Sequence, residues 1–104
     1  MSNLTQEEWV EQLAQDSNAL VLDVRTLEEV QGGIIQNAIH IDFYQGHGFI
    51  EKLQELDKSK NYYVYCRSGN RSGQACNIMS QMGFENAFNL IGGMLEWEGD
   101  VVQP

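Results

Sequence analysis

The stretch YYVYCRSGNRS, residues 62–72, decides the fold that we expect for this chain. Its first four residues are aromatic or β-branched, which is typical of a β-strand. The residues after it place apolar or small side chains at Ala75, Ile78, Met79 and Met82, the spacing of one helix face. We therefore predict a strand that ends at Tyr65, then a tight turn, then a helix over about 71–82.

The same turn holds the candidate nucleophile of the chain. Cys66 lies there together with Gly69 and with two of the three arginines, Arg67 and Arg71. Backbone N–H groups point inward in such a turn, and the N-terminus of the following helix adds partial positive charge. A thiol in this setting is expected to ionise readily and to face a pocket for anions. The alternative is a buried apolar cysteine at a strand end.

Strand and helix patterns alternate along the rest of the chain. Thr5 and Glu8 form a capping-box signature for a first helix, and residues 26–31 form a short helix that Gly32 and Gly33 end. Further strands are predicted at 19–22, 38–41 and 87–90, a helix at 49–56, and a helical stretch at 94–97. This alternation predicts an α/β domain with a mainly parallel sheet of four to five strands.

The length and composition fit one domain over residues 1–104, with 42% hydrophobic residues. No apolar run approaches the about 20 residues of a membrane span, and the first residues lack the features of a signal peptide. Two cysteines without a disulfide pattern favour a reduced, cytoplasmic protein. The two histidines and two cysteines match no zinc spacing, so we expect neither a metal nor a cofactor.

The charge balance narrows the choice of partners. Fifteen acidic and six basic residues give a formal net charge of -9. This balance argues against nucleic acid or an acidic membrane surface as partner. Positive charge at Arg67 and Arg71, in an otherwise acidic protein, is what a site for a small anion requires.

The cysteine loop resembles the active-site loop of the rhodanese sulfurtransferase family, with its Cys-Arg-x-Gly-x-Arg/Thr pattern. Three more segments resemble that family in the same order along the chain. They are LDVR at 22–25 (its Asp-Val/Ala-Arg strand end), EVQGGIIQNA at 29–38 (its Glu-aromatic-x-x-Gly-His-Ile-Pro-Gly-Ala segment), and GF at 83–84 with NLIGGMLEW at 89–97 (its Gly-Phe…Leu-x-Gly-Gly…Trp ending). The resemblance implies a rhodanese-like three-layer domain with helices on both faces of the sheet and a short extra strand near Leu4.

The resemblance has departures in the second of these segments. Ile34, Gln36 and Asn37 stand where the family usually has His, Pro and Gly. Because Asn tolerates the left-handed backbone that a glycine often signals, Asn37 is a mild replacement.

The resemblance also implies an activity. The thiolate of Cys66 would take the outer sulfur of thiosulfate or of a persulfide, and would pass it to cyanide, a thiol or an acceptor protein. Asp23 and Arg25 are expected to support the loop through hydrogen bonds and ion pairs. The residues expected to bind the anionic donor, through loop amides and charge, are Arg67, Ser68, Gly69, Asn70, Arg71 and Ser72.

Two other functions stay open from the sequence. A persulfide carrier that delivers sulfur to a partner protein shares the first half-reaction with the enzyme. A cysteine-dependent phosphatase is the less favoured alternative. Phosphatases of this kind have five residues between Cys and Arg, whereas four lie between Cys66 and Arg71.

Three side chains have a structural and a functional interpretation, and His40 has a structural one alone. Cys76 is predicted to be a buried, sheet-facing residue of the next helix, with a relay thiol as the alternative. His40 is predicted to be a core histidine on a strand, and His47 an exposed loop residue with pocket-rimming as the alternative. Ser72 is expected first as a turn or cap residue and second as a hydrogen-bond donor to the thiolate.

Overall fold

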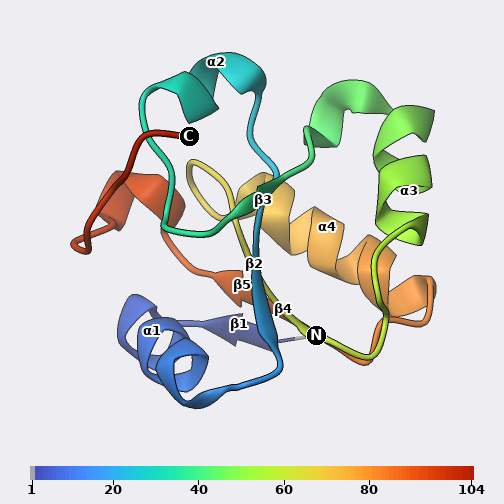
Figure 1. Ribbon diagram of the computed structural model, residues 1–104, viewed down its shortest axis with the longest axis horizontal. Coiled ribbons are helices and arrows are strands. Elements are labelled where there is room, and N and C mark those ends of the chain that lie inside the picture. Colours follow the sequence, from blue (N-terminus) through green and yellow to red (C-terminus); the bar gives the residue numbers. More distant parts are fainter. Residues whose placement is uncertain (1) are drawn as a thin grey trace.

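The computed structural model describes residues 2–104, which fold around one five-stranded parallel sheet (Figure 1). The sheet order is β1-β5-β4-β2-β3, and every neighbouring pair is parallel. The strands are β1 (Ser2–Leu4), β2 (Ala19–Asp23), β3 (Ile39–His40), β4 (Asn61–Tyr65) and β5 (Asn86–Leu90). The predicted α/β architecture is therefore confirmed, including the short strand at Leu4.

Helices lie on both faces of this sheet. They are α1 (Gln6–Gln15), α2 (Leu27–Gln31), α3 (His47–Gln54) and α4 (Asn70–Gln81), with short 3-10 helices η1 (Phe43–Gln45) and η2 (Gly93–Glu96). Helix α1 covers one face of the sheet, and α3 and α4 cover the other (Figure 1). The result is the three-layer arrangement that the family resemblance implies.

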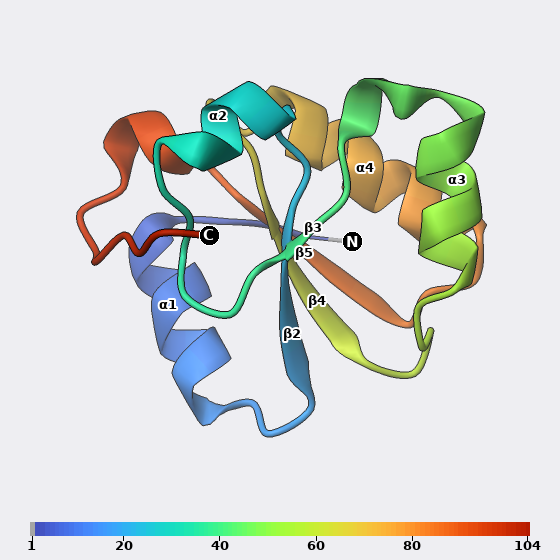
Figure 2. The ribbon, with the colours of Figure 1, turned by 45° about the horizontal axis from the view of Figure 1, so that its top comes forward.

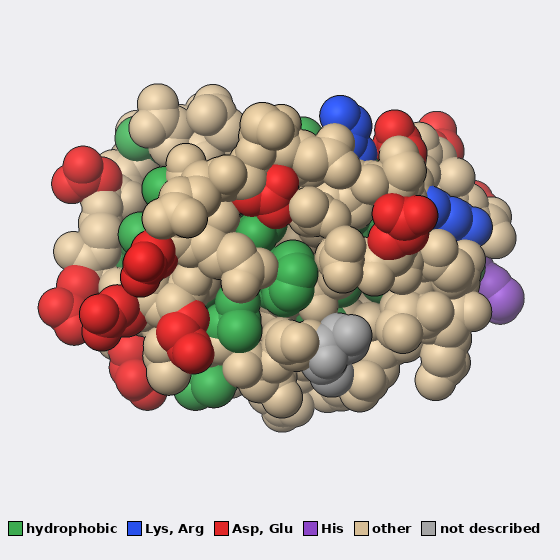
Figure 3. Space-filling model, turned by 90° about the horizontal axis from the view of Figure 1, so that it is seen from below, with side chains coloured by type: hydrophobic (Ala, Val, Ile, Leu, Met, Phe, Trp, Pro, Cys, Tyr) green, Lys and Arg blue, Asp and Glu red, His purple; other side chains and the backbone are tan. Residues whose placement is uncertain are grey.

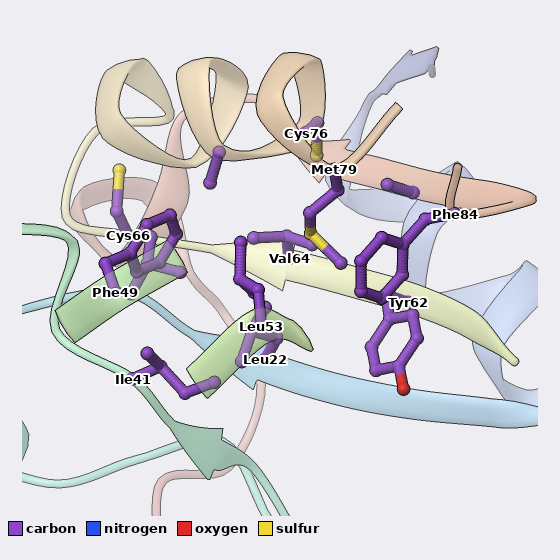
Figure 4. Close-up of a cluster of buried hydrophobic side chains, with 13 residues drawn as sticks. Leu22, Ile41, Phe49, Leu53, Tyr62, Val64, Cys66, Cys76, Met79 and Phe84 are labelled. Atoms are coloured by element: carbon purple, nitrogen blue, oxygen red, sulfur yellow. The ribbon is translucent and has the colours of Figure 1, made fainter. Parts of the chain in front are cut away.

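Strand β4 shows why the layers hold together. Its side chains alternate, as the period of two in a strand requires. Tyr62 and Val64 belong to the core between the sheet and the helices α3 and α4 (Figure 4). Tyr63 and Tyr65 join Trp9 of α1 in the core of the opposite face. All of these side chains are fully buried, so β4 delivers the next residue, at position 66, from a rigid support.

Three elements differ from the sequence prediction. Helix α3 begins at His47, two residues before the predicted start, because the carbonyl of Gly46 accepts bonds from the amides of Phe49 and Ile50. His47 therefore lies in a helix rather than in a loop, although it is exposed as predicted. Strand β3 is only two residues long, and the predicted 94–97 helical stretch is the 3-10 helix η2.

The carboxyl ends of the parallel strands bring α2, the start of α4 and η2 to one edge of the sheet (Figure 2). Backbone hydrogen bonds tie this edge together. The amide of Met94 donates to the carbonyl of Cys66 (3.0 Å), and the amide of Leu95 donates to that of Arg67 (2.9 Å). Sites in open α/β sheets form at this edge, which is where the cysteine lies.

Candidate active site

The sulfur of Cys66 caps the N-terminus of α4. Gly69, the residue before the helix, has no side chain for that purpose. Instead, the Cys66 Sγ accepts hydrogen bonds from the amide of Gly69 at 3.1 Å and from the amide of Ser72 at 3.4 Å. The hydroxyl of Ser72 lies 3.4 Å from the same sulfur. Free N–H groups at a helix start attract a negatively charged acceptor, so this position favours a thiolate.

The pKa of Cys66 lies below that of an ordinary thiol. Burial raises the pKa, but hydrogen bonds from the hydroxyl and amide of Ser72, and from the amides of Gly69 and Ser68, outweigh the effect of burial. The predicted acidity of the thiol is thus present, and the loop amides that the sequence analysis expects are among its causes, together with the Ser72 hydroxyl. Directed hydrogen bonds, rather than the two arginines, are the main influence that lowers the pKa.

Arg71 has a partner that the sequence does not predict. Its guanidinium donates to both carboxylate oxygens of Glu29 in α2, at 2.7 and 2.9 Å, and lies 5.3 Å from the ring centre of Tyr44. Such a bidentate pair fixes the guanidinium in one orientation. Arg71 therefore fastens α4 to α2, and its expected role as ligand of a donor anion remains a prediction.

Arg67 has the opposite setting. Its side chain is exposed, and within residues 2–104 it forms no ion pair. The sequence analysis expects both arginines to bind the anion, whereas in the structure Arg71 is paired with Glu29 and Arg67 is not paired with any acid of residues 2–104. The reason is tertiary, because Glu29 is 42 residues away from Arg71 in the sequence.

Asp23 and Arg25 form a buried ion pair, as predicted. The Arg25 Nη2 lies 2.8 Å from a carboxylate oxygen of Asp23 and also donates to the carbonyl of Gly33 at 2.7 Å. The guanidinium lies 5.5 Å from the ring centre of Tyr65, the last residue of β4. The pair therefore anchors the segment around Gly33 to the ends of β2 and β4, and its expected support of the cysteine loop remains a prediction.

Close backbone contacts at two glycines shape the loop. A Cβ on Gly69 would lie 3.1 Å from the carbonyl oxygen of Leu90, and the residue has a left-handed φ of 98°. Both features explain why a glycine occupies this position. A Cβ on Gly93 would lie only 2.5 Å from the carbonyl oxygen of Cys66. The absence of a side chain at Gly93 thus lets η2 pack closely against the backbone of Cys66 and Arg67. The sequence analysis does not predict this role.

A hollow of about 730 Å³ lies away from the cysteine loop, between α1 and residues 97–100. Four of its lining residues are acidic: Glu7, Glu11, Glu98 and Asp100. Acidic side chains gather on the left of the face shown in Figure 3, with apolar side chains between them. This hollow would repel an anionic donor, so we place the candidate site at the loop and not here.

The sequence profile of rhodanese-like domains matches residues 6–100, which is nearly the whole chain. This chain belongs to the rhodanese-like domain family. A solved structure, a rhodanese-like domain protein from Staphylococcus aureus, superposes with a TM-score of 0.84 at 30% identity, covering 100% of this chain and 99% of that one. The match confirms the family resemblance and the fold expected from the sequence.

Named relatives of this rhodanese-like domain point to sulfur transfer. "Putative sulfurtransferase YtwF" of Bacillus subtilis is 42% identical over 91 residues, which cover 86% of this chain and 84% of that protein. A "Sulfurtransferase" of Allochromatium vinosum is 32% identical over 97 residues, covering 93% and 88%. "Putative sulfur carrier protein YrkF" of Bacillus subtilis is 33% identical over 94 residues, covering 89% of this chain and 49% of that protein. These relatives support sulfur transfer in general, with a sulfur donor and a sulfur acceptor as partners.

The other residues that the sequence analysis singles out have the following contacts within this rhodanese-like domain. Cys76 is fully buried, and burial raises its pKa to about 12, as suits a core thiol (Figure 4). His40 is half-buried, and its Nε2 lies 2.7 Å from the carbonyl oxygen of Arg25. Asn70 is exposed in the first turn of α4, where its side chain accepts a bond from Gln74 at 3.2 Å.

The departures from the family segment at 29–38 also have a structural account. Asn37 has a φ of 67°, the left-handed conformation that makes Asn a mild replacement for Gly. Ile34 exchanges backbone hydrogen bonds with Val102, both at 2.8 Å, so its backbone fastens the C-terminal segment.

The described residues hold neither a group of three or more side chains suited to a metal ion nor a helix long and apolar enough to cross a membrane.

Sequence reasoning missed the contribution of three side chains to the site: Glu29, Tyr44 and Asn89. Glu29 stands out in the sequence as the first residue of the family-like segment 29–38, but no local pattern indicates Arg71 as its partner. Asn89 leaves a usable signal, because a polar residue inside the apolar run 87–90 of a central strand needs a buried partner. Its partners become visible only in the folded chain.

The ion pair of Glu29 predicts a defined pH dependence of stability. The hydrogen bond from Arg71 lowers the pKa of Glu29 from 4.5 to about 2. Because the folded-state pKa is depressed, the stabilisation is complete above pH 4.5 and disappears as the pH falls towards 2. We expect the free energy of unfolding of wild type to exceed that of Glu29→Gln at neutral pH, and the gap to close over that window.

Urea unfolding at a series of pH values measures this gap. Glu28→Gln is the matched control, because Glu28 lies in the same helix and forms no ion pair within residues 2–104. The free energy of unfolding of Glu28→Gln, plotted against pH, should run parallel to that of wild type. A Glu29→Gln curve that also stays parallel down to pH 2 would contradict the prediction.

Proposed function

We propose that this rhodanese-like domain is a sulfurtransferase that moves sulfane sulfur from thiosulfate or a persulfide to a thiophilic acceptor through a persulfide on Cys66. One observation carries the proposal, namely the amides of Gly69 and Ser72 and the Ser72 hydroxyl gathered around the Cys66 sulfur. The two amides already point at the sulfur and stabilise negative charge there without rearrangement.

The proposed reaction has two displacement steps. The Cys66 thiolate attacks the outer sulfur of thiosulfate, a bond forms between the two sulfurs, and the old bond breaks with its electron pair leaving on sulfite. The enzyme then holds a Cys66 persulfide, whose charge lies on the outer sulfur. An acceptor thiolate or cyanide attacks this outer sulfur, takes it away, and the electron pair of the broken bond restores the Cys66 thiolate. Covalent catalysis thus divides one transfer into two easier ones.

Two features of the loop bear on how a donor would bind. Cys66 has 0% exposure, so a donor would reach the sulfur only after side chains around the loop move apart. Arg67 is the exposed cation next to it and is suited to attract an anion from solution. Loop amides from Ser68 onward would then hold the transferred sulfur. In this assignment Arg67 attracts the donor, and Arg71 keeps the loop rigid.

Intact-mass spectrometry tests the proposal. After incubation with thiosulfate, we expect the protein to gain one sulfur atom that maps to Cys66, and cyanide should remove it as thiocyanate. The same protein should hydrolyse aryl phosphates negligibly, because the ring from Cys66 to Arg71 has four intervening residues. A protein that gains no sulfur from thiosulfate or from a persulfide donor would refute the proposal. Phosphatase activity that Cys66→Ser abolishes would replace it with the alternative reaction.

A sulfur carrier is the second candidate, and the likeness to the protein named as sulfur carrier YrkF favours it. The carrier would form the same persulfide but pass it slowly to cyanide or small thiols. Transfer rates to a series of acceptors separate the two functions. Fast turnover with small acceptors supports the enzyme, whereas loading without turnover supports the carrier.

A further inference from the structure

The hydroxyl of Ser72 has one hydrogen and two competing acceptors. Its Oγ lies 3.4 Å from the sulfur of Cys66 and 2.5 Å from the Oδ1 of Asn89 in β5. Ser72 is 0% exposed and Asn89 is 4% exposed, so water does not supply a substitute partner. A hydroxyl donates one hydrogen bond at a time. Whichever acceptor takes the hydrogen, the other loses it.

The orientation of the Asn89 carboxamide follows from its other contacts. Its Nδ2 donates to the Oδ1 of Asn3 in β1 at 2.9 Å and to the carbonyl of Gly69 at 3.1 Å. Turning the amide over would place its oxygen against these two acceptors, so the oxygen must face Ser72. The carboxamide is therefore a fixed acceptor, held by β1 on one side and by the cysteine loop on the other.

The charge on the Cys66 sulfur decides where the hydrogen lies. When the sulfur is a thiol, Ser72 donates to Asn89 across the shorter distance, and the thiol can donate to the Ser72 oxygen. When the sulfur is a thiolate, the hydroxyl turns to it, and the Asn89 oxygen is left buried without that hydrogen. A buried acceptor that loses its partner is costly. Asn89 thus favours the states in which the Cys66 sulfur is uncharged.

We propose that Asn89 is a positioning residue for sulfur transfer, which acts through the Ser72 hydroxyl by competing with the Cys66 sulfur for its hydrogen. The proposal rests on Cys66 being the nucleophile of the proposed function. In the persulfide the charge lies on the outer sulfur, so the hydroxyl can stay on Asn89. The competition therefore favours the loaded enzyme over the free thiolate, and it keeps that thiolate reactive, because nucleophilicity falls as the thiol becomes more acidic.

Other charged or titratable groups around the loop act without the Ser72 hydroxyl. Arg71 of α4 interacts with the Cys66 charge while paired with Glu29 of α2, and the Cys76 thiol of α4 also senses that charge. From η2, the carboxylate of Glu96 lies against Gly92, and Arg67 belongs to the loop itself. Their effects on the Cys66 titration are the same with and without the Ser72 hydroxyl. A double-mutant cycle between Asn89 and Ser72 therefore cancels these effects.

The titration of Cys66, followed by thiolate ultraviolet absorbance against a Cys66→Ser counterpart, tests the competition. We expect Asn89→Ala to lower the midpoint by about half to one pH unit, because the hydroxyl becomes free to serve the thiolate. In a Ser72→Ala background, Asn89→Ala should shift nothing. Asn86→Ala is the control on the same strand, since its side chain bonds Asn61 at the opposite end. A shift of equal size in both backgrounds, or no shift in either, would overturn the proposal.

A second measurement uses protein with Asn89 intact, in case Asn89→Ala fails to fold. The side-chain amide signals of Asn89 in an NMR pH titration should follow the Cys66 midpoint in wild type and lose most of that response in Ser72→Ala. An undiminished response in Ser72→Ala would overturn the proposal. Both measurements need no sulfur donor. Their failure is therefore distinct from a failure of the protein to load sulfur.

Discussion

Cys66→Ser should abolish sulfur transfer, whereas Cys76→Ser should retain most of it. A serine hydroxyl at position 66 does not ionise near neutral pH and cannot form a persulfide, so the first displacement has no nucleophile. Cys76 is fully buried, and burial raises its pKa to about 12, so it is a thiol at neutral pH. For both variants, thiocyanate formed from thiosulfate and cyanide measures sulfur transfer. Intact mass after incubation with thiosulfate measures persulfide formation.

The Cys76→Ser variant is the matched control, because it also replaces a buried cysteine sulfur by a serine oxygen. Circular dichroism establishes that each variant remains folded. Complete loss of transfer in folded Cys76→Ser would assign Cys76 to a relay of sulfur. Residual persulfide in Cys66→Ser would remove Cys66 from the role of nucleophile.

Gly93→Ala should lower both stability and sulfur transfer substantially. A Cβ at this position would lie 2.5 Å from the carbonyl oxygen of Cys66 and 2.6 Å from that of Arg67, at a φ of 51°. Those carbonyls cannot move away freely, because the amides of Met94 and Leu95 are bonded to them. Overpacking of this kind costs about 1–3 kcal/mol. Thermal unfolding and the rate of persulfide formation measure the two effects.

Gly83→Ala separates the collision from backbone strain. Gly83 also has a positive φ, of 96°, but a Cβ there would meet nothing within 4 Å. Its substitution should cost about 1 kcal/mol from strain alone and leave the rate of persulfide formation unchanged. If the two alanine variants lose equal stability and keep equal rates, the contact between η2 and the loop does not shape the site.

The sequence by itself determined the features that depend on near neighbours. The alternating strand 62–65 and the helix spacing that follows predicted β4 and α4, and with them the place of Cys66 at a helix start. The capping box of Thr5 and Glu8 predicted the beginning of α1. These patterns are readable because propensity, side-chain period and capping act over a few residues. The left-handed backbone at Asn37 was expected only because the family that the chain resembles has a glycine there.

The tertiary structure decided how the loop groups are used. Arg71 binds Glu29 across 42 residues, and Asn89 joins Ser72 to Asn3 across 17 and 86 residues. No local pattern contains these pairs, because the sheet order β1-β5-β4 and the placing of α2 above the strand ends create them. The sequence therefore revealed which residue is the candidate nucleophile. Only the packing of distant segments decided that Arg71 binds Glu29 and that Ser72 binds Asn89, because hydrogen bonds require contact and contact between distant residues is set by topology.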